Sequence, residues 1–240
     1  MRKYISVLAF GFFIMAPFAG HAYDELSRDT SDPLFLQGQQ QFLASAALSY
    51  WDDIVRAGLA GSFGITDRLA IAANVHYQVD FDGAQDGFSP VDVGGVYRLM
   101  RAGDNNAHMI TDVIAGFKVG GATRVRVPDF ADSTYYAGLR FGRQWTGMTL
   151  AATVKSSWIF DNAMGMSYID FTPEAYVRLN PDWRAGASFT VRKATTPRYN
   201  QEWLGARIVR QYGRTQYIGH VDFEFEDKDL QFGARVNVLF

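Results

Sequence analysis

The chain has 240 residues, no cysteine, and 23 basic side chains against 25 acidic ones. The weakly negative charge gives no electrostatic basis for binding nucleic acid. The lack of cysteine excludes a disulfide framework and any cysteine-ligated metal site. Glycine (23 residues), phenylalanine (19) and tyrosine (12) against only 7 prolines are typical of aromatic-rich strands joined by turns.

The segment 1–22 has the features of a secretory signal peptide. Two basic residues precede a short apolar run, and the small residues Gly20 and Ala22 predict cleavage after Ala22. The alternative is an uncleaved membrane anchor, but the run is short and is followed by Pro17. No later stretch approaches the ~20 apolar residues that a spanning helix needs. The sequence therefore predicts an exported chain that is not a helical membrane protein.

Alternation of apolar and polar residues begins near residue 40 and recurs to the end of the chain. In RLAIAANVHYQVDF, apolar residues from Leu69 to Phe81 alternate with a second series that includes Asn74, His76 and Asp80. A period of two is that of a strand with one apolar and one polar side. About twelve such segments are long enough for a tilted strand to cross a bilayer. They lie near 40–51, 54–65, 68–81, 89–100, 108–119, 134–145, 148–160, 168–179, 183–192, 203–212, 215–225 and 230–240.

The connections also alternate in character. Tight turns (GITDRL, AGDNNA, WTGM, LNPDW, YGRT) are interleaved with longer polar loops (DFDGAQDGFS, GGATRVRVPDFADS, DNAMGMS, KATTPRYNQE), and the hairpins at YWDDI and EDKD are short. This pattern predicts an all-β fold, a transmembrane antiparallel up-and-down β-barrel of about 12 strands formed by residues 39–240. Residues 23–38, which have no clear period, are interpreted as a periplasmic N-terminal lead or a partial plug.

The polarity of the two faces favours a membrane barrel over a soluble one. About eight strands are enough for a packed soluble barrel, whereas twelve enclose more space than side chains fill. Charges of both signs lie at mid-strand on the polar faces, whereas the apolar faces carry almost none. Arg143 and Arg210, on the apolar parity, lie close to predicted periplasmic turns, where they can reach the headgroups. Aromatic residues gather near the ends of the apolar faces, as in interfacial girdles. They are Tyr50, Phe81, Tyr97, Trp145, Phe160, Phe171, Trp183, Tyr217 and Phe225.

The last strand, LQFGARVNVLF, alternates as far as its final residue, and Phe240, Val238 and Val236 share its apolar side. With the signal peptide and the strand pattern, this ending resembles bacterial outer-membrane β-barrel proteins of a small porin-like type. In that group a terminal aromatic strand is the assembly signal read by the barrel-assembly machinery. The resemblance implies a Gram-negative outer membrane, with lipid and lipopolysaccharide as surroundings. The GITDRL turn is similar to turns in several families of small-solute channels, and it does not distinguish one of these families from another.

The polar faces supply the charges of the lumen. A common register across the AGDNNA turn sets Arg98 against Asp112 and Asp92 against Lys118, and Asp222 can face Arg207 across YGRT. A register across LNPDW pairs Asp170 with Arg192, and sets Arg178 against Arg184, which would need an acid or an anion nearby. The predicted pore-lining residues are His76, Asp80, Asp92, Arg98, Asp112, Lys118, Arg140, Lys155, Asp170, Glu174, Arg178, Arg184, Arg192, Arg207, His220, Asp222, Glu224 and Arg235.

Two interpretations of these charges remain open. The ion pairs either only hold the wall together or also set a field across a narrow pore. The long loop GGATRVRVPDFADS carries Arg124 and Arg126, and it is either a solvated surface loop or a gate folded over the mouth.

We expect no enzymatic activity and no cofactor. Outside the signal peptide the chain has three histidines, and His220 has no evident serine neighbour on the adjoining strands; no phosphate loop or nucleophile elbow is present. A calcium site at Asp80, Asp82 and Asp86 is an alternative for the loop acids. The predicted function is a passive channel for small polar solutes through a charge-lined lumen. The alternatives are a closed structural or adhesive barrel and a lipid- or peptide-hydrolysing outer-membrane enzyme.

Overall fold

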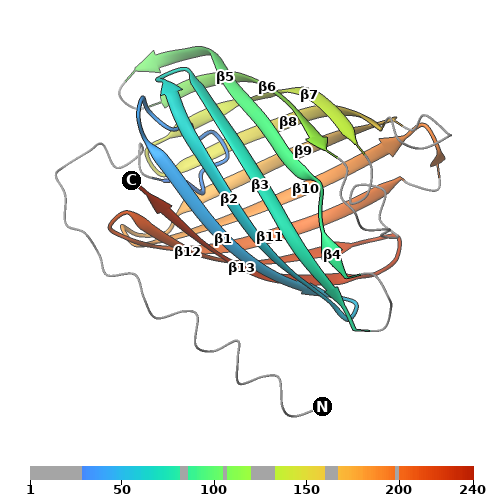
Figure 1. Ribbon diagram of the computed structural model, residues 1–240. Coiled ribbons are helices and arrows are strands. Elements are labelled where there is room, and N and C mark those ends of the chain that lie inside the picture. The colour runs from blue at the N-terminus through green and yellow to red at the C-terminus, as the bar shows by residue number, and fades with distance from the viewer. Residues whose placement is uncertain (1–28, 82–85, 105–106, 120–132, 160–166, 198–199) are drawn as a thin grey trace.

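The computed structural model describes residues 29–81, 86–104, 107–119, 133–159, 167–197 and 200–240, and they form an antiparallel β-barrel (Figure 1). Its long strands are β1 (Phe42–Trp51), β2 (Ile54–Thr66), β3 (Leu69–Asp80), β5 (Val91–Asp104), β6 (Ala107–Val119), β7 (Thr134–Trp145), β8 (Met148–Ile159), β9 (Ser167–Arg178), β10 (Trp183–Ala194), β11 (Gln201–Tyr212), β12 (Thr215–Glu224) and β13 (Leu230–Leu239). The short strand β4 (Gly87–Phe88) pairs with β3. Over the described ranges, no helix is long and apolar enough to span a membrane.

The barrel is closed by its first and last long strands. Each long strand pairs antiparallel with its neighbours in the chain, and β1 pairs with β13 from Leu43 opposite Leu239 to Tyr50 opposite Phe232. This confirms the predicted all-β up-and-down barrel of 12 strands, to which the two residues of β4 are an addition. Among the described strands, each long strand is thus paired on both sides, as a barrel in a bilayer requires.

The two rims of the barrel differ. Because the number of long strands is even, β1 starts and β13 ends at the same rim, and the connections after β2, β5, β7, β9 and β11 lie there too. We call it the short-turn rim. The opposite, long-loop rim carries the connections after β1, β3, β6, β8, β10 and β12.

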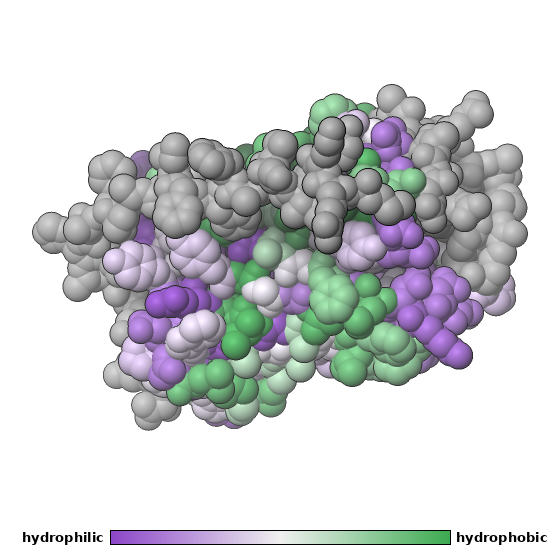
Figure 2. All heavy atoms as spheres, turned by 90° about the horizontal axis from the view of Figure 1, so that it is seen from below, coloured by the Kyte–Doolittle hydropathy of each residue, from purple (hydrophilic) through white to green (hydrophobic). Residues whose placement is uncertain are grey.

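The two faces of the wall have the polarity of a membrane barrel. Outward positions are apolar and exposed, as at Ile71 (47%) and Val154 (38%), whereas the inward Gln78 and Asp112 are fully buried. Figure 2 shows hydrophobic side chains over the middle of the visible face, between more hydrophilic patches toward either end. An apolar outer band around a polar interior is the pattern expected of a wall surrounded by lipid.

The two outward-facing arginines of the apolar face contact tryptophans near the short-turn rim. The Arg143 guanidinium lies 5.0 Å from the ring centre of Trp145, and that of Arg210 lies 5.6 Å from the ring of Trp183, its register partner. Such contacts keep a long side chain at the level of the headgroups. Most of the aromatic residues predicted for the girdles are exposed, whereas Phe160 lies outside the described residues.

Strand β5 departs from simple alternation near its end. The register between β5 and β6 shifts between Arg98 and Met100, a β-bulge that leaves both Leu99 and Met100 exposed. Beyond the bulge β5 continues to Asp104, past the strand end predicted near residue 100. The simple alternation therefore holds only as far as Arg98.

Candidate pore lumen

The predicted pore-lining residues all occupy inward positions, which alternate along each strand with the exposed apolar residues of the outer face. The structure groups several of them into clusters that join neighbouring strands. Arg124 and Arg126, predicted as a loop gate, lie outside the described residues.

The first cluster joins β5, β6 and β7 around one buried carboxylate. Arg98 Nε donates to Asp112 Oδ1 at 2.9 Å, as the predicted register requires, and Arg140 Nη2 lies 2.5 Å from Asp112 Oδ2. Asp112 is fully buried, so the two cations offset the cost of removing its charge from water. The same two arginines donate to the backbone carbonyls of Leu34 at 2.6 Å and Phe35 at 3.2 Å.

The second cluster joins β8, β9 and β10 nearer the long-loop rim. Arg192 Nε donates to Asp170 Oδ1 at 2.7 Å, which confirms the predicted pair, and Lys155 Nζ lies 3.4 Å from Asp170 Oδ2. The guanidinium of Arg192 also stacks 4.0 Å from the ring centre of Tyr168. As in the first cluster, a single carboxylate, that of Asp170, forms ion pairs with two basic side chains.

The third cluster brings an acid from outside the wall to the predicted pair of like charges. Arg178 and Arg184 face one another in the register between β9 and β10, as predicted. Arg184 Nε donates to Asp29 Oδ2 at 2.7 Å, and the Tyr176 hydroxyl and Gln216 Nε2 each donate to Asp29 Oδ1 at 2.8 Å. The acid that the sequence required is therefore supplied by the residues that precede β1.

Those residues, 29–41, lie inside the short-turn rim (Figure 1). Asp32 accepts hydrogen bonds from Thr149 Oγ1 at 2.5 Å, from Gln144 Nε2 at 3.1 Å and from the Leu34 amide at 2.8 Å. Burial raises the pKa of the Asp32 carboxyl above its ordinary value, and those three hydrogen bonds act in the opposite direction. Leu34 packs against two apolar wall residues, Ile110 and Ala151.

Two predicted wall contacts differ in the structure. Asp222 lies opposite Gly205, and His220 is the register partner of Arg207, so the expected pairing of Asp222 with Arg207 is wrong by two residues. Arg207 Nη2 instead donates to Glu174 Oε2 at 3.1 Å, across β10.

Asp92 and Lys118 are register partners, as predicted. The carboxylate of Asp92 accepts hydrogen bonds from Tyr136 Oη at 3.0 Å and from Asn74 Nδ2 at 3.4 Å. Uncharged side chains thus help to stabilise the carboxylate of Asp92, for which the sequence predicted only an ion pair.

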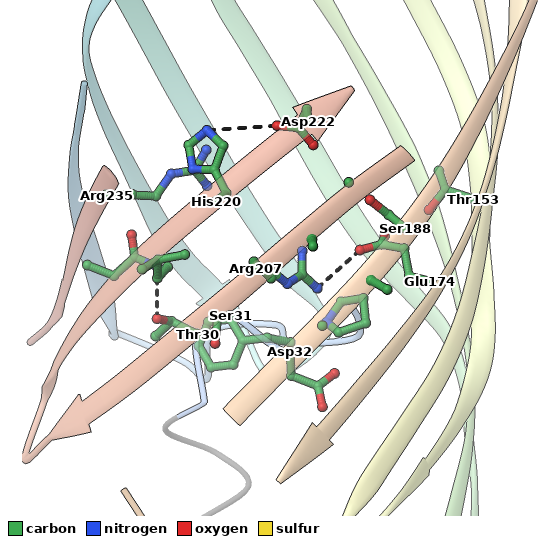
Figure 3. Close-up of a pocket in the computed structure, with 18 of the residues that line it drawn as sticks. Thr30, Ser31, Asp32, Thr153, Glu174, Ser188, Arg207, His220, Asp222 and Arg235 are labelled. Carbon is green, nitrogen blue, oxygen red and sulfur yellow. Dashed lines mark hydrogen bonds and ion pairs between the residues drawn. The ribbon is translucent and has the colours of Figure 1, made fainter. Parts of the chain in front are cut away.

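A cavity of about 630 Å³ lies between the N-terminal segment and the inner wall formed by strands β6 to β13 (Figure 3). Its charged and titratable lining consists of Asp32, Arg140, Glu174, Arg207, His220, Asp222 and Arg235. A Cβ at Gly233 would overlap the imidazole of His220, and one at Gly205 would overlap Oδ1 of Asp222, so both side chains lie over glycines of the neighbouring strand.

The same cavity contains Ser188, which lies opposite Glu174 in the register between β9 and β10 but was not predicted as a site residue. Ser188 Oγ, like Asp222, lies close to Gly205, although it belongs to β10, two strands away from His220. The sequence indicates that Ser188 faces inward, because of its position in the alternation. It does not indicate that Ser188 and Asp222 approach one another over the intervening Gly205. The uncharged partners Gln144, Thr149, Tyr176 and Gln216 were also missed, because only charges were considered.

The geometry does not assemble a hydrolytic triad from these groups. The distance from His220 Nε2 to Asp222 Oδ2 is 3.9 Å, longer than a hydrogen bond, and no hydrogen bond among the described residues joins Ser188 to His220. Within the part of the chain that the structure describes, no three His, Asp or Glu side chains are grouped so as to hold a metal ion.

Comparison with protein-family models finds no match, and comparison with curated protein sequences finds none either. Among solved structures, the chain is similar to the KdgM porin, with a TM-score of 0.59 and 10% identity over 82% of this chain and 98% of that one. It is similar to the NanC porin, with a TM-score of 0.60 and 9% identity over 82% and 98% of the two chains. An outer-membrane channel from Pseudomonas putida F1 gives 0.59 and 10% over 88% and 99%. The chain therefore has the fold of bacterial outer-membrane porins.

Proposed function

We propose that the protein is a passive outer-membrane channel for small polar solutes. The observation that carries the proposal is the charged inward wall around an open cavity of about 630 Å³, enclosed by an apolar outer face. A pore lined with charges of both signs favours hydrated polar solutes over apolar ones. The likeness to porins in fold agrees with this function, and one of those structures is described as the KdgM porin in complex with disordered oligogalacturonate.

We infer further that residues 23–38 are a periplasmic lead whose end acts as a partial plug, after removal of a signal peptide at residues 1–22. The contacts of residues 29–37 with the wall support this role. The short-turn rim then faces the periplasm, since barrels of this class have short periplasmic turns and longer outer loops. Lipid, lipopolysaccharide and the barrel-assembly machinery are the partners that go with such a location.

The proposal includes no catalysis, in agreement with the porin and channel structures that the fold is similar to. A closed structural barrel is the second candidate, and the docking of the N-terminal segment favours it. Both candidates share the fold and differ in whether solutes pass.

Single-channel recording in a planar lipid bilayer separates them. We expect discrete conductance steps from the purified, folded protein, with selectivity that changes when wall charges are replaced. The folded state of the same sample is checked by its β-sheet circular dichroism. Silence from folded protein, including a variant in which the N-terminal segment is displaced, contradicts the channel and supports the closed barrel.

A further inference from the structure

The cavity of the lumen contains two charges of opposite sign that the wall leaves without an ionic partner of fixed charge. Most of the charged lining is engaged: Arg140 with Asp112, Glu174 with Arg207, and Asp32 with the hydrogen-bond donors given above. Arg235 makes no ion pair or hydrogen bond with any described residue. Asp222 has only the histidine nitrogen at 3.9 Å.

The surroundings of Arg235 explain why its charge stays free. Its register partners are Ala47 on β1 and Ile218 on β12, neither of which can accept a hydrogen bond through its side chain. The side chain is exposed although it is on the inward face, and Figure 3 shows it extending toward His220 within the cavity. A guanidinium in this position presents its donors to whatever occupies the lumen.

Asp222 lies on the other side of the same imidazole. In the view of Figure 3, the Arg235 side chain reaches the imidazole of His220, and Asp222 lies beyond that ring at the end of the dashed line. The imidazole of His220 lies close to Gly233, and the carboxylate of Asp222 lies close to Gly205, in space that a larger side chain at either glycine would occupy. The two charges are therefore neighbours that do not touch.

We propose that this cavity binds a small zwitterion that carries a carboxylate and an ammonium group, of the amino-acid class. The carboxylate pairs with the guanidinium of Arg235, which offers a planar pair of donors. The ammonium group donates to the carboxylate of Asp222. The proposal names a class of solute for the proposed channel, and it rests on the channel function only because the solute must reach the lumen.

Charge balance distinguishes this ligand from a simple anion. An anion at Arg235 would leave the nearby carboxylate of Asp222 unpaired and would be repelled by it. A simple cation bound at Asp222 would be repelled by the guanidinium of Arg235 and would leave that group unpaired. A zwitterion satisfies both groups without changing the net charge of the cavity. The volume of about 630 Å³ is within the usual range for small-molecule sites.

The test measures binding of five probes to the purified full-length mature protein by saturation-transfer NMR. Glycine, β-alanine and 4-aminobutyrate are zwitterions of increasing charge separation, whereas acetate and methylammonium each carry one of the two charges. We expect at least one zwitterion to bind about ten-fold more tightly than either single ion, which corresponds to about 1.4 kcal/mol. Arg235→Gln and Asp222→Asn should each remove this preference.

The outward-facing Arg143→Gln is the matched control, since it removes one positive charge outside the lumen and should leave the preference unchanged. Acetate binding as tightly as every zwitterion would overturn the proposal in favour of an anion site. A preference that survives in both folded lumen variants would overturn the assignment to these residues. Conductance steps without zwitterion binding would overturn this inference alone, whereas binding without conductance would support it and overturn the channel.

Discussion

Arg184 donates a hydrogen bond from Nε to Asp29 at 2.7 Å, and the two residues are 155 positions apart in the chain. The contact neutralises a buried wall arginine whose register partner, Arg178, has the same charge. The N-terminal segment is thus held by electrostatics as well as by apolar packing.

Replacing Asp29 should release the segment. Asp29→Ala leaves Arg184 buried beside Arg178 without its acid, a change that typically costs about 3 kcal/mol. Undocking avoids that cost, so we expect single-channel conductance to rise. As the chain has no cysteine, a single Pro33→Cys substitution reports undocking by faster reaction with a thiol reagent. Asp227→Ala, in the exposed β12–β13 hairpin, is the control. Unchanged conductance and labelling would show that Asp29 does not hold the segment.

Conductance should depend on pH through Asp32. Burial raises the pKa of this carboxyl in the docked segment above 3.8, so the docked form holds the proton more tightly than the released form. Docking therefore becomes more favourable as the pH falls through the window just above 3.8, and less favourable as the pH rises through it.

We expect conductance to fall with acidification in that window. Asp32→Asn should resemble the acidic state and lose this response, whereas Asp182→Asn, in an exposed turn, should keep it. A response that persists unaltered in Asp32→Asn would assign it to another group.

Gly64→Ala should displace the segment without changing any charge. Gly64 exchanges backbone hydrogen bonds with Gln40 at 2.8 Å and Gln41 at 2.9 Å, and a Cβ there would overlap the carbonyl oxygen of Gly38. The overlap is with backbone, so no side-chain rotation relieves it. We expect higher conductance, as in Asp29→Ala. Gly147→Ala is the matched control at the same rim, since nothing lies within 4 Å of its Cβ position. Equal conductance in both variants would contradict the docking geometry.

The polarity of the wall can be tested with adjacent residues of β3. Val75→Arg places a charge in the hydrocarbon near mid-strand and should lower the free energy of unfolding by ~2–4 kcal/mol. Asn74→Arg points inward, toward its register partner Asp92, and should be nearly neutral. Urea unfolding in lipid vesicles measures both. Equal costs for the two arginines would contradict the assignment of the faces.

The strands and much of their pairing were predictable from the sequence because both depend on local rules. The period of two in Leu69–Asp80 fixes which residues face inward. Arg98 lies opposite Asp112 as predicted, although the β-bulge between Arg98 and Met100 shifts the register by one from that of the adjoining turn. The prediction for Asp222 and Arg207 was wrong by two residues, since a turn of a few residues allows more than one register.

The candidate site was less predictable because its contacts cross intervening strands or join distant segments. Nothing near Asp29 in the sequence marks it as the partner of Arg184, although the pair Arg178 and Arg184 showed that some acid was needed. The free charge of Arg235 could not be predicted either, because it depends on which neighbours are apolar once the barrel closes.

The position of the N-terminal segment also bears on the order of assembly. Thr30 donates to Gln216 on β12 at 2.5 Å and accepts from Asn237 on β13 at 3.0 Å, and Gln37 donates to Ser62 on β2. These partners lie on both sides of the seam where β1 meets β13. A seam between strands so far apart in sequence has a high contact order and forms late. The segment can make its full set of contacts only once β1 has paired with β13. It therefore stabilises the closed barrel after the strands have paired, and does not bring them together.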